Sequence, residues 1–371
     1  MRFAFFAFII TVFLLINSYV LVRGWQALSS TPLFRTLYIA VILSLFLSLV
    51  GSMAFGYVLP LPIAKVVSFV GFTYVVIFSY LFLSFVLVDI VRIANYFLHF
   101  LTSGMATFRM WSVVLTLSIT AIALIVGNYN FNHPEVVTLN LKSEKPFQNK
   151  EIKIVAVSDI HLGISIDKKN LKRYVELINE QKPDLVLLAG DISDRLMEPI
   201  IRQNMEEEFR AIKAPMGVYA INGNHEHYAE TSDATAKFLQ KAGVIVLRDT
   251  VEMVDNRFYI VGRDDLTNPK RKSLSQIING LDKNKPLILM DHQPYHLEEA
   301  EQNNIDFQIS GHTHNGQFFP GNLFVKRMYE LSYGYLKKGK THFYVSSGLG
   351  LWGPQYRIGT QSELVVINFK F

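Results

Sequence analysis

Acidic side chains are distributed very unevenly along this 371-residue chain. Residues 1–130 contain a single one, Asp89, whereas most other charges lie after Glu135. An apolar stretch of that length with almost no charge is typical of a membrane region. We therefore expect a membrane part joined to a soluble part.

The first part contains four long apolar runs, and the first of them, with about 20 residues, is long enough to cross a hydrocarbon core of roughly 30 Å. A signal peptide is the alternative for the first run, but it normally has a shorter apolar core and a small-residue cleavage site. Buried helices of a soluble core would carry a polar stripe. Residues 1–130 are therefore predicted to form an all-α region of about four transmembrane helices. The runs are Phe3–Val22, Leu37–Leu59, Val66–Val88 (extending toward Leu101) and Trp111–Val126.

The arginines predict how this region is oriented. Arg23 and Arg35 lie between the first two runs, and Arg92 and Arg109 lie between the last two. Positive residues favour the cytoplasmic side, so the first and third loops are expected in the cytoplasm. With four spans, the soluble part then faces outward. Asp89 and Arg92 have the spacing of an ion pair at a helix end.

After a connector at residues 131–150, the pattern changes to that of an α/β domain over residues 151–371. Short buried strands alternate with amphipathic helices from Ile152 onward. The expected strands are Val136–Leu141 (an edge strand within the connector), Ile154–Val157, Leu185–Ala189, Val218–Ile221, Phe258–Val261, Leu287–Met290, Phe307–Ile309, Phe343–Val345 and Leu364–Phe369. The expected helices are Leu171–Gln181, Ile200–Ile212, Asp233–Ala242 and Leu274–Leu281.

Five of these strands run directly into polar clusters. The clusters read SDIH (158–161), GDISD (190–194), NGNHEH (222–227), DHQP (291–294) and SGHTHNGQ (310–317). Ligands collect at the carboxyl ends of strands in open α/β sheets, so these clusters should converge. Turn chemistry explains the glycines, aspartates and asparagines, but not that five of the ten histidines occupy these positions.

The donor atoms in these clusters are those of a metal site. Residues two apart in extended chain point to the same face, so Asp159 with His161, and His312 with His314, can each offer two donors. Glycines before Asp191, Asn224 and His312 allow close backbone approach. The chain has no cysteine, which excludes disulfides and thiolate ligands. Oxygen and nitrogen donors suit two divalent ions such as Mn, Fe or Zn.

In this order, the five motifs resemble the signature of the calcineurin-like metallophosphoesterases, over about residues 150–371. Membrane-associated bacterial members are the most similar, and they have GHTHGGQ where this chain has GHTHNGQ. Asn315 thus replaces a glycine, which affects the loop rather than the ligands. The resemblance implies a four-layer α/β/β/α sandwich behind the membrane region, in a multi-pass protein of the bacterial cytoplasmic membrane.

The resemblance also implies roles for individual residues. Asp159, His161, Asp191 and His314 would hold one metal ion, and Asp191, Asn224, His292 and His312 the other. His225 would be the catalytic imidazole beside the phosphate. Metal-activated hydroxide would then hydrolyse a phosphodiester, phosphomonoester or pyrophosphate.

The membrane region suggests a lipid-linked substrate, such as a phospholipid or the UDP-diacylglucosamine that some similar proteins cleave. Two alternatives stay open. One is a membrane receptor or scaffold whose domain binds a phosphorylated ligand without turnover. The other is a transporter with an appended enzyme, although the single acidic residue argues against a polar path. The dispersed charge predicts no nucleic-acid partner, and the sequence does not determine the oligomeric state.

Overall fold

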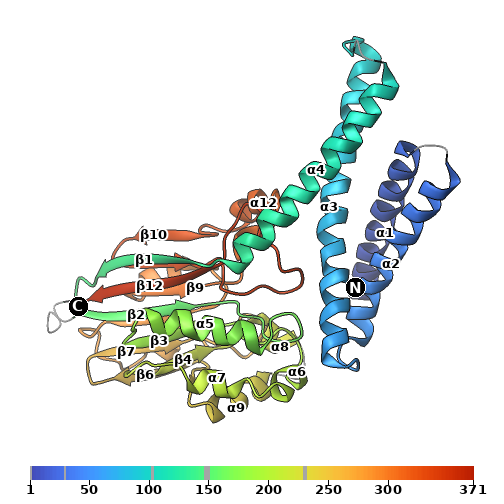
Figure 1. The fold of residues 1–371 in the computed structure, drawn as a ribbon. Coiled ribbons are helices and arrows are strands. Elements are labelled where there is room, and N and C mark those ends of the chain that lie inside the picture. The colour runs from blue at the N-terminus through green and yellow to red at the C-terminus, as the bar shows by residue number, and fades with distance from the viewer. Residues whose placement is uncertain (1, 29–30, 102–103, 146–150, 229–231) are drawn as a thin grey trace. The chain divides into compact units, whose positions relative to one another are not determined.

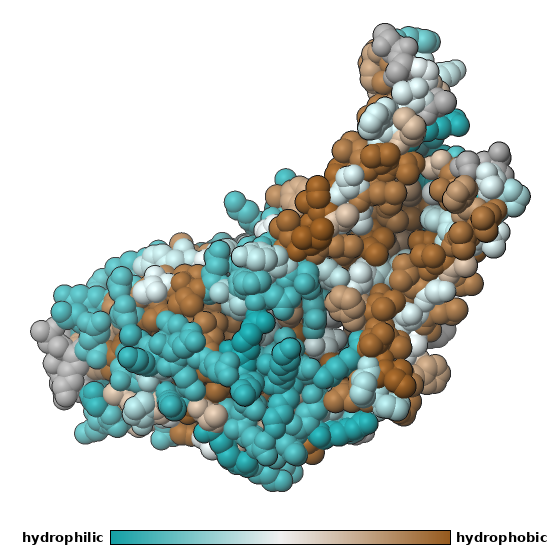
Figure 2. All heavy atoms as spheres, viewed as in Figure 1, coloured by the Kyte–Doolittle hydropathy of each residue, from teal (hydrophilic) through white to brown (hydrophobic). Residues whose placement is uncertain are grey.

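The computed structural model describes residues 2–371 except 29–30, 102–103, 146–150 and 229–231. The chain divides into two compact units, Met1–Val126 and Gly127–Phe371. Figure 1 shows helices alone in the first unit and two sheets flanked by helices in the second. Hydrophobic residues dominate the visible surface of the helical unit, and hydrophilic residues that of the second (Figure 2).

Four helices follow the four predicted apolar runs. They are α1 (Arg2–Ala27), α2 (Pro32–Phe55), α3 (Leu61–Leu98) and α4 (Met105–Asn132). Three described segments are long and apolar enough to cross a membrane, namely α2, α3 and Thr107–Asn132 of α4. The first predicted run coincides with α1, but the side chains of residues 2–7, 9 and 10 lie outside the described part. The three long apolar helices indicate membrane anchoring.

Close contact between α2 and α3 organises the interior of the helical unit. Gly71 lies against the backbone of Leu49, where a Cβ would come within 2.6 Å of the Leu49 Cα. Small residues allow such approach in membrane helices. The predicted pair of Asp89 and Arg92 is confirmed at 3.2 Å, and Arg23 also contacts Asp89 at 2.7 Å.

The second unit contains two mixed six-stranded sheets. The first has the order β1-β12-β2-β3-β4-β5 and the second the order β10-β11-β9-β8-β7-β6. The strands of the first sheet are β1 (Glu135–Lys142), β2 (Glu151–Val157), β3 (Leu185–Ala189), β4 (Val218–Ile221), β5 (Ile245–Val246) and β12 (Glu363–Lys370). Those of the second are β6 (Thr250–Val254), β7 (Phe258–Gly262), β8 (Leu287–Met290), β9 (Phe307–Ser310), β10 (Gly334–Lys338) and β11 (Thr341–Val345).

Side chains along each buried strand point alternately to the two faces of its sheet, so the buried apolar residues form three separate clusters. In β2, Ile154 and Ala156 belong to the cluster that also contains residues of β7, β8 and β9, so this cluster lies between the sheets. Val155 and Val157 belong instead to the cluster with helical residues such as Tyr174. A third cluster joins the far face of the second sheet to its own helices. The two sheets therefore form an α/β sandwich.

The helices on the sheets are mostly short. They are α5 (Lys168–Glu180), α6 (Glu198–Arg202), α7 (Glu206–Arg210), α8 (Asn224–Tyr228), α9 (Ser232–Lys241), α10 (Leu274–Ile277), α11 (Leu297–Gln302), the 3-10 turn η1 (His314–Gly316) and α12 (Gly321–Met328). A capping box formed by Asp167 and Asn170 starts α5. The single helix predicted over Ile200–Ile212 is wrong, because Asn204 adopts a left-handed backbone (φ 51°) and separates α6 from α7.

The edge strand predicted at Val136–Leu141 is confirmed as β1. It pairs in parallel with β12 along its whole length, from Glu135 opposite Glu363 to Lys142 opposite Lys370. The last turn of α4 also belongs to this unit, because Phe131 is 1% exposed and lies in the cluster between the first sheet and its helices. The soluble fold therefore includes residues that precede position 150.

This arrangement makes a prediction about fragments. A fragment 127–371 should unfold at a higher temperature than a fragment 151–371, which lacks both β1 and the buried Phe131. Burying one phenylalanine contributes about 1.5–3 kcal/mol. Thermal unfolding followed by circular dichroism would compare them, with Phe131→Ala in the longer fragment as an intermediate case. Equal melting temperatures would contradict the assignment of β1 to the folded unit.

Candidate metal centre

All seven residues predicted as metal ligands lie just beyond the carboxyl ends of strands. Three strands of the first sheet and two of the second contribute them. Asp159 and His161 follow β2, Asp191 follows β3, Asn224 follows β4, His292 follows β8, and His312 and His314 follow β9. The site is therefore built where corresponding edges of the two sheets meet, as the strand-end argument predicts.

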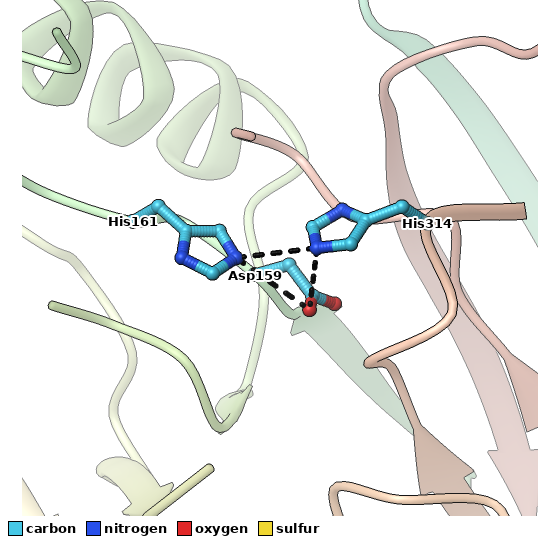
Figure 3. A group of neighbouring side chains, drawn as sticks. All are labelled: Asp159, His161 and His314. Atoms are coloured by element: carbon cyan, nitrogen blue, oxygen red, sulfur yellow. Dashed lines mark hydrogen bonds and ion pairs between the residues drawn. The ribbon is translucent and has the colours of Figure 1, made fainter. Parts of the chain in front are cut away.

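Asp159, His161 and His314 form one group (Figure 3). The Nε2 atoms of the two imidazoles are 3.3 Å apart. Oδ1 of Asp159 lies 3.5 Å from Nε2 of His314 and 3.9 Å from Nε2 of His161. All three side chains are buried. Three donor atoms thus point at one small volume.

A second group forms around Asp191. Its Oδ2 lies 3.2 Å from Nε2 of His292, and that nitrogen lies 3.2 Å from Oδ1 of Asn224. The same Asn224 oxygen is 2.7 Å from Nδ1 of His312. Oδ2 of Asp191 is also 3.7 Å from Nε2 of His161, which belongs to the first group. Asp191 therefore lies between the two groups.

These distances fit a divalent cation in each group. Two donors at about 2.1 Å from one ion, at angles near 100°, are roughly 3.2 Å apart. Neutral imidazole is the form that binds metal. Burial lowers the pKa of His161 to about 3 and holds the pKa of His314 well below its usual value, so both stay neutral. The donor set contains no sulfur, which fits borderline or hard ions.

In the second group, by contrast, the carboxylate of Asp191 favours the protonated form of His292. Burial opposes protonation of His292, yet the carboxylate of Asp191 outweighs it and raises the pKa of His292 well above its usual value. Nδ1 of His292 lies 2.8 Å from the carbonyl oxygen of Ala189, so this nitrogen can donate while Nε2 faces Asp191. A bound cation would replace the proton at Nε2.

The backbone around the site is strained. Five of the seven predicted ligands have left-handed φ angles between 49° and 71°: Asp159, His161, Asp191, His312 and His314. Such conformations cost of order 1 kcal/mol each in residues with a side chain and cluster at functional sites. Asn315 is also left-handed (φ 49°), a conformation that asparagine tolerates. The replacement of a glycine at this position is therefore accommodated.

Two glycines allow the loops to approach one another. A Cβ on Gly223 would collide with the side chain and the amide nitrogen of Asp191. A Cβ on Gly311 would collide with the carboxylate of Asp159 and the side chain of Ser158. Glycine is thus required here because neighbouring loops fill the space of a side chain.

The carboxylate of Glu226 connects the loops that carry Asp191 and Asn224. It accepts hydrogen bonds from the backbone nitrogens of Asp191 (3.1 Å), Ser193 (2.8 Å) and Gly223 (2.7 Å). The side chain is fully buried. Burial and the nearby Asp191 raise the pKa of Glu226 to about 7. The structure therefore places Glu226 where it supports the loops of the predicted ligands.

The predicted catalytic imidazole, His225, lies beside both groups. Its ring centroid is 4.5 Å from that of His161. Its Nδ1 donates to the carbonyl oxygen of Asp194 at 2.6 Å and lies 3.3 Å from the Asp194 carboxylate. Burial alone would lower its pKa, but the hydrogen bond to Asp194 and the charge of Asp191 raise the pKa of His225 to about 9. Asp194 therefore fixes the orientation of the His225 ring and favours its protonated form.

Two arginines support the loop that carries His292. Arg263 and Arg271 donate to the Oδ2 of Asp291 at 3.1 and 2.5 Å, and Arg263 also donates to Glu299. Arg263 therefore holds a carboxylate next to a predicted ligand, His292. A separation of 28 residues between Arg263 and Asp291 hides this pair from local pattern analysis.

The side chain of Arg357 also has a structural role, because it holds backbone carbonyl groups in place. Its buried guanidinium donates to the carbonyl oxygens of Ser347, Gly348 and Gly350. His227 and His296 lie outside the ligand groups. His227 contacts Asp264 at 2.9 Å, and His296 is exposed beside Glu298.

Removal of the Glu226 carboxylate should weaken metal binding. Glu226→Ala would leave three buried backbone N–H groups without this acceptor, and loss of such supporting contacts typically lowers metal affinity 10- to 100-fold, by rough estimate. Calorimetric titration of the purified protein with Mn²⁺ would measure the change. Glu298→Ala, whose half-exposed side chain lies outside the donor groups, is the matched control. Equal affinities of the two variants would show that Glu226 does not support the ligands.

Comparisons with known proteins identify relatives of this chain. Residues 152–316 match the family described as Calcineurin-like phosphoesterase. "Uncharacterized metallophosphoesterase Cj0846" of Campylobacter jejuni is 32% identical over 264 residues, which cover 69% of each chain. "Transmembrane protein with metallophosphoesterase domain" of Danio rerio is 30% identical over 274 residues, covering 69% of this chain and 62% of that protein. The crystal structure of TT1561 of Thermus thermophilus aligns over 54% of this chain and 91% of that chain, with 13% identity and a TM-score of 0.35. The chain belongs to the calcineurin-like metallophosphoesterase family.

Proposed function

We propose that this protein hydrolyses a phosphoester at a centre of two divalent cations. The position of Asp191 between the two donor groups is the observation that carries the proposal. One cation would be held by Asp159, His161, Asp191 and His314, and the other by Asp191, Asn224, His292 and His312. Such a pair supplies an activated water as nucleophile and neutralises charge on the phosphate oxygens.

The protein's own contribution to the reaction centres on His225. With Nδ1 bonded to the Asp194 carbonyl oxygen, the ring is fixed and its other nitrogen is available. The hydrogen bond to Asp194 and the charge of Asp191 raise the pKa of His225 against the effect of burial, which favours a proton on the imidazole. His225 can therefore stabilise charge on the phosphate and donate a proton to the leaving oxygen. Mn, Fe or Zn would each suit the donor set.

A phosphate-bearing lipid, such as a phospholipid or a nucleotide-linked glycolipid precursor, is the substrate class that we propose. The membrane helices support this choice, because they hold the domain near lipid substrates. The alternative is a receptor or scaffold that binds a phosphorylated ligand without turnover. The complete donor set and the His225 ring held beside it by Asp194 favour an enzyme.

Activity should depend on two residues of the centre. The purified protein with Mn²⁺ should hydrolyse an aryl phosphate or phosphodiester. His225→Ala should lower kcat by about 10²–10⁴, because it removes a general acid. Asp191→Asn should reduce both metal binding and turnover. His296→Ala, a surface histidine, should behave as wild type. Metal binding without any turnover would favour the receptor alternative, and unchanged turnover in His225→Ala would refute its role.

We further propose that the second unit lies outside the cytoplasm. The support is the excess of arginine in the loops after α1 and α3, with α1 counted as a fourth span. Alkaline phosphatase, linked after Phe371 through a flexible spacer, should be active in cells because this reporter requires export. A green fluorescent protein at the same position is the reciprocal control. Activity of the cytoplasmic reporter alone would reverse the proposed orientation.

A further inference from the structure

Helix α12 and the two residues before it, Phe319 and Pro320, expose an unusual amount of apolar surface. Phe319, Leu323, Phe324 and Met328 are 51%, 53%, 64% and 66% exposed. Among the described residues after Asn132, only two other large hydrophobic side chains, Ile201 and Tyr228, are more than half exposed. No residue of α12 is buried. A helix on a soluble domain normally turns its apolar stripe inward, whereas this one faces outward.

This apolar surface is fixed to the metal centre. The helix begins five residues after η1, which contains His314. Gly321 packs directly on this turn, since a Cβ there would lie 2.6 Å from the carbonyl oxygen of Gly316. Gly321 N also donates to Phe318 O at 2.5 Å. A partner that binds α12 is therefore held next to the predicted ligands.

The same surface adjoins the last turns of α4, which belong to the second unit. Gly127 and Asn130 lie in the last turns of α4 and belong to the second unit. The Gly127 carbonyl oxygen accepts from Arg357 N (2.8 Å), and Asn130 donates to Arg357 O (3.1 Å). The next residue, Ile358, accepts from the backbone nitrogen of Phe319 at 2.7 Å. The chain thus leaves its apolar span beside the residues that start the exposed surface.

The basic residues near this surface indicate which kind of partner covers it. Lys326 and Arg327 lie in the last turn of α12, and both are exposed. Apolar side chains combined with Lys and Arg are typical of helices that lie in the membrane interface, where anionic headgroups attract the basic residues. Trp352, which is also exposed, has its ring 6.4 Å from that of His225. Tryptophan is enriched at membrane–water interfaces.

We propose that α12 docks into the headgroup region of an anionic bilayer. Phe319, Leu323, Phe324 and Met328 insert among the lipids, and Lys326 and Arg327 contact their phosphates. The metal centre then opens at the membrane surface, where it meets phosphate-bearing lipids without their extraction into water. This consequence for the substrate rests on the proposed function, whereas docking itself does not.

A lipid-contact measurement tests docking independently of activity. The chain has no cysteine, so Phe324→Cys in the full-length protein offers a single site for a fluorescent label. In vesicles of phosphatidylglycerol with headgroup-nitroxide lipids, insertion to about 5–10 Å places the label within quenching range. We expect strong quenching there and little at Lys283→Cys, an exposed control position. Equal, weak quenching at both positions would overturn the proposal, including when α12 is covered by another protein surface.

Two further variants connect docking to catalysis. Leu323→Ser with Phe324→Ser should lower hydrolysis of a phospholipid in vesicles by about tenfold, because two apolar side chains no longer insert. Turnover of a soluble aryl phosphate should not change. Lys326→Gln with Arg327→Gln should weaken quenching on phosphatidylglycerol but not on phosphatidylcholine vesicles. If quenching occurs but the wild type hydrolyses neither substrate, the proposed function fails while docking stands. Equal loss on both substrates would refute the docking role.

Discussion

The buried carboxylate of Asp191 is the constraint on which the candidate centre depends. It is 1% exposed, and the imidazoles of His161, His225 and His292 surround it. An ionised carboxylate in such a place is costly unless positive charge and hydrogen bonds compensate it. Here His225 N donates to its Oδ1 at 2.9 Å, and the neighbouring imidazoles hold its pKa below the usual range. The negative charge therefore persists and attracts cations.

Glu226 shows the consequence of placing a second carboxyl nearby. Two adjacent carboxylates cannot both ionise without cost, so one pKa rises. The rise falls on Glu226, while Asp191 keeps its charge. The backbone donors of Ser193 and Gly223 limit that rise. Together with the backbone nitrogen of Asp191, they also hold the two loops together. One side chain thus supports the geometry, and the other supplies the charge.

Much of this organisation could be predicted from local sequence pattern. The buried strands β3, β4 and β8 begin and end at the predicted residues, because continuous apolar runs bounded by Gly, Pro, Asp and Asn define them. The rule that ligands collect at the carboxyl ends of strands also predicted that the histidines and aspartates lie close together. Asn204, by contrast, interrupts a helix through its backbone conformation, which apolar periodicity does not reveal. Helix α12 was missed because its apolar residues do not face a core.

The supporting contacts of the centre could not be predicted, because they join residues distant in sequence. Glu226 bonds to Asp191, 35 residues earlier, and Arg271 to Asp291, 20 residues later. A motif names the residues that meet a metal or a phosphate, but it does not say which side chains hold them. The role of Arg357 also required the structure, since its three acceptors are backbone carbonyl oxygens with no sequence signature.

The pairing of β1 with β12 has a consequence for how the protein is made. More than two hundred residues separate these strands, and β12 lies between β1 and β2 in the first sheet. During synthesis, α4 and β1 leave the ribosome long before β12 does. The early strands then keep unpaired edges beside the bilayer until β12 is synthesised, and unpaired edges promote aggregation. The sheet closes late, so assembly of the domain follows rather than accompanies insertion of the helices.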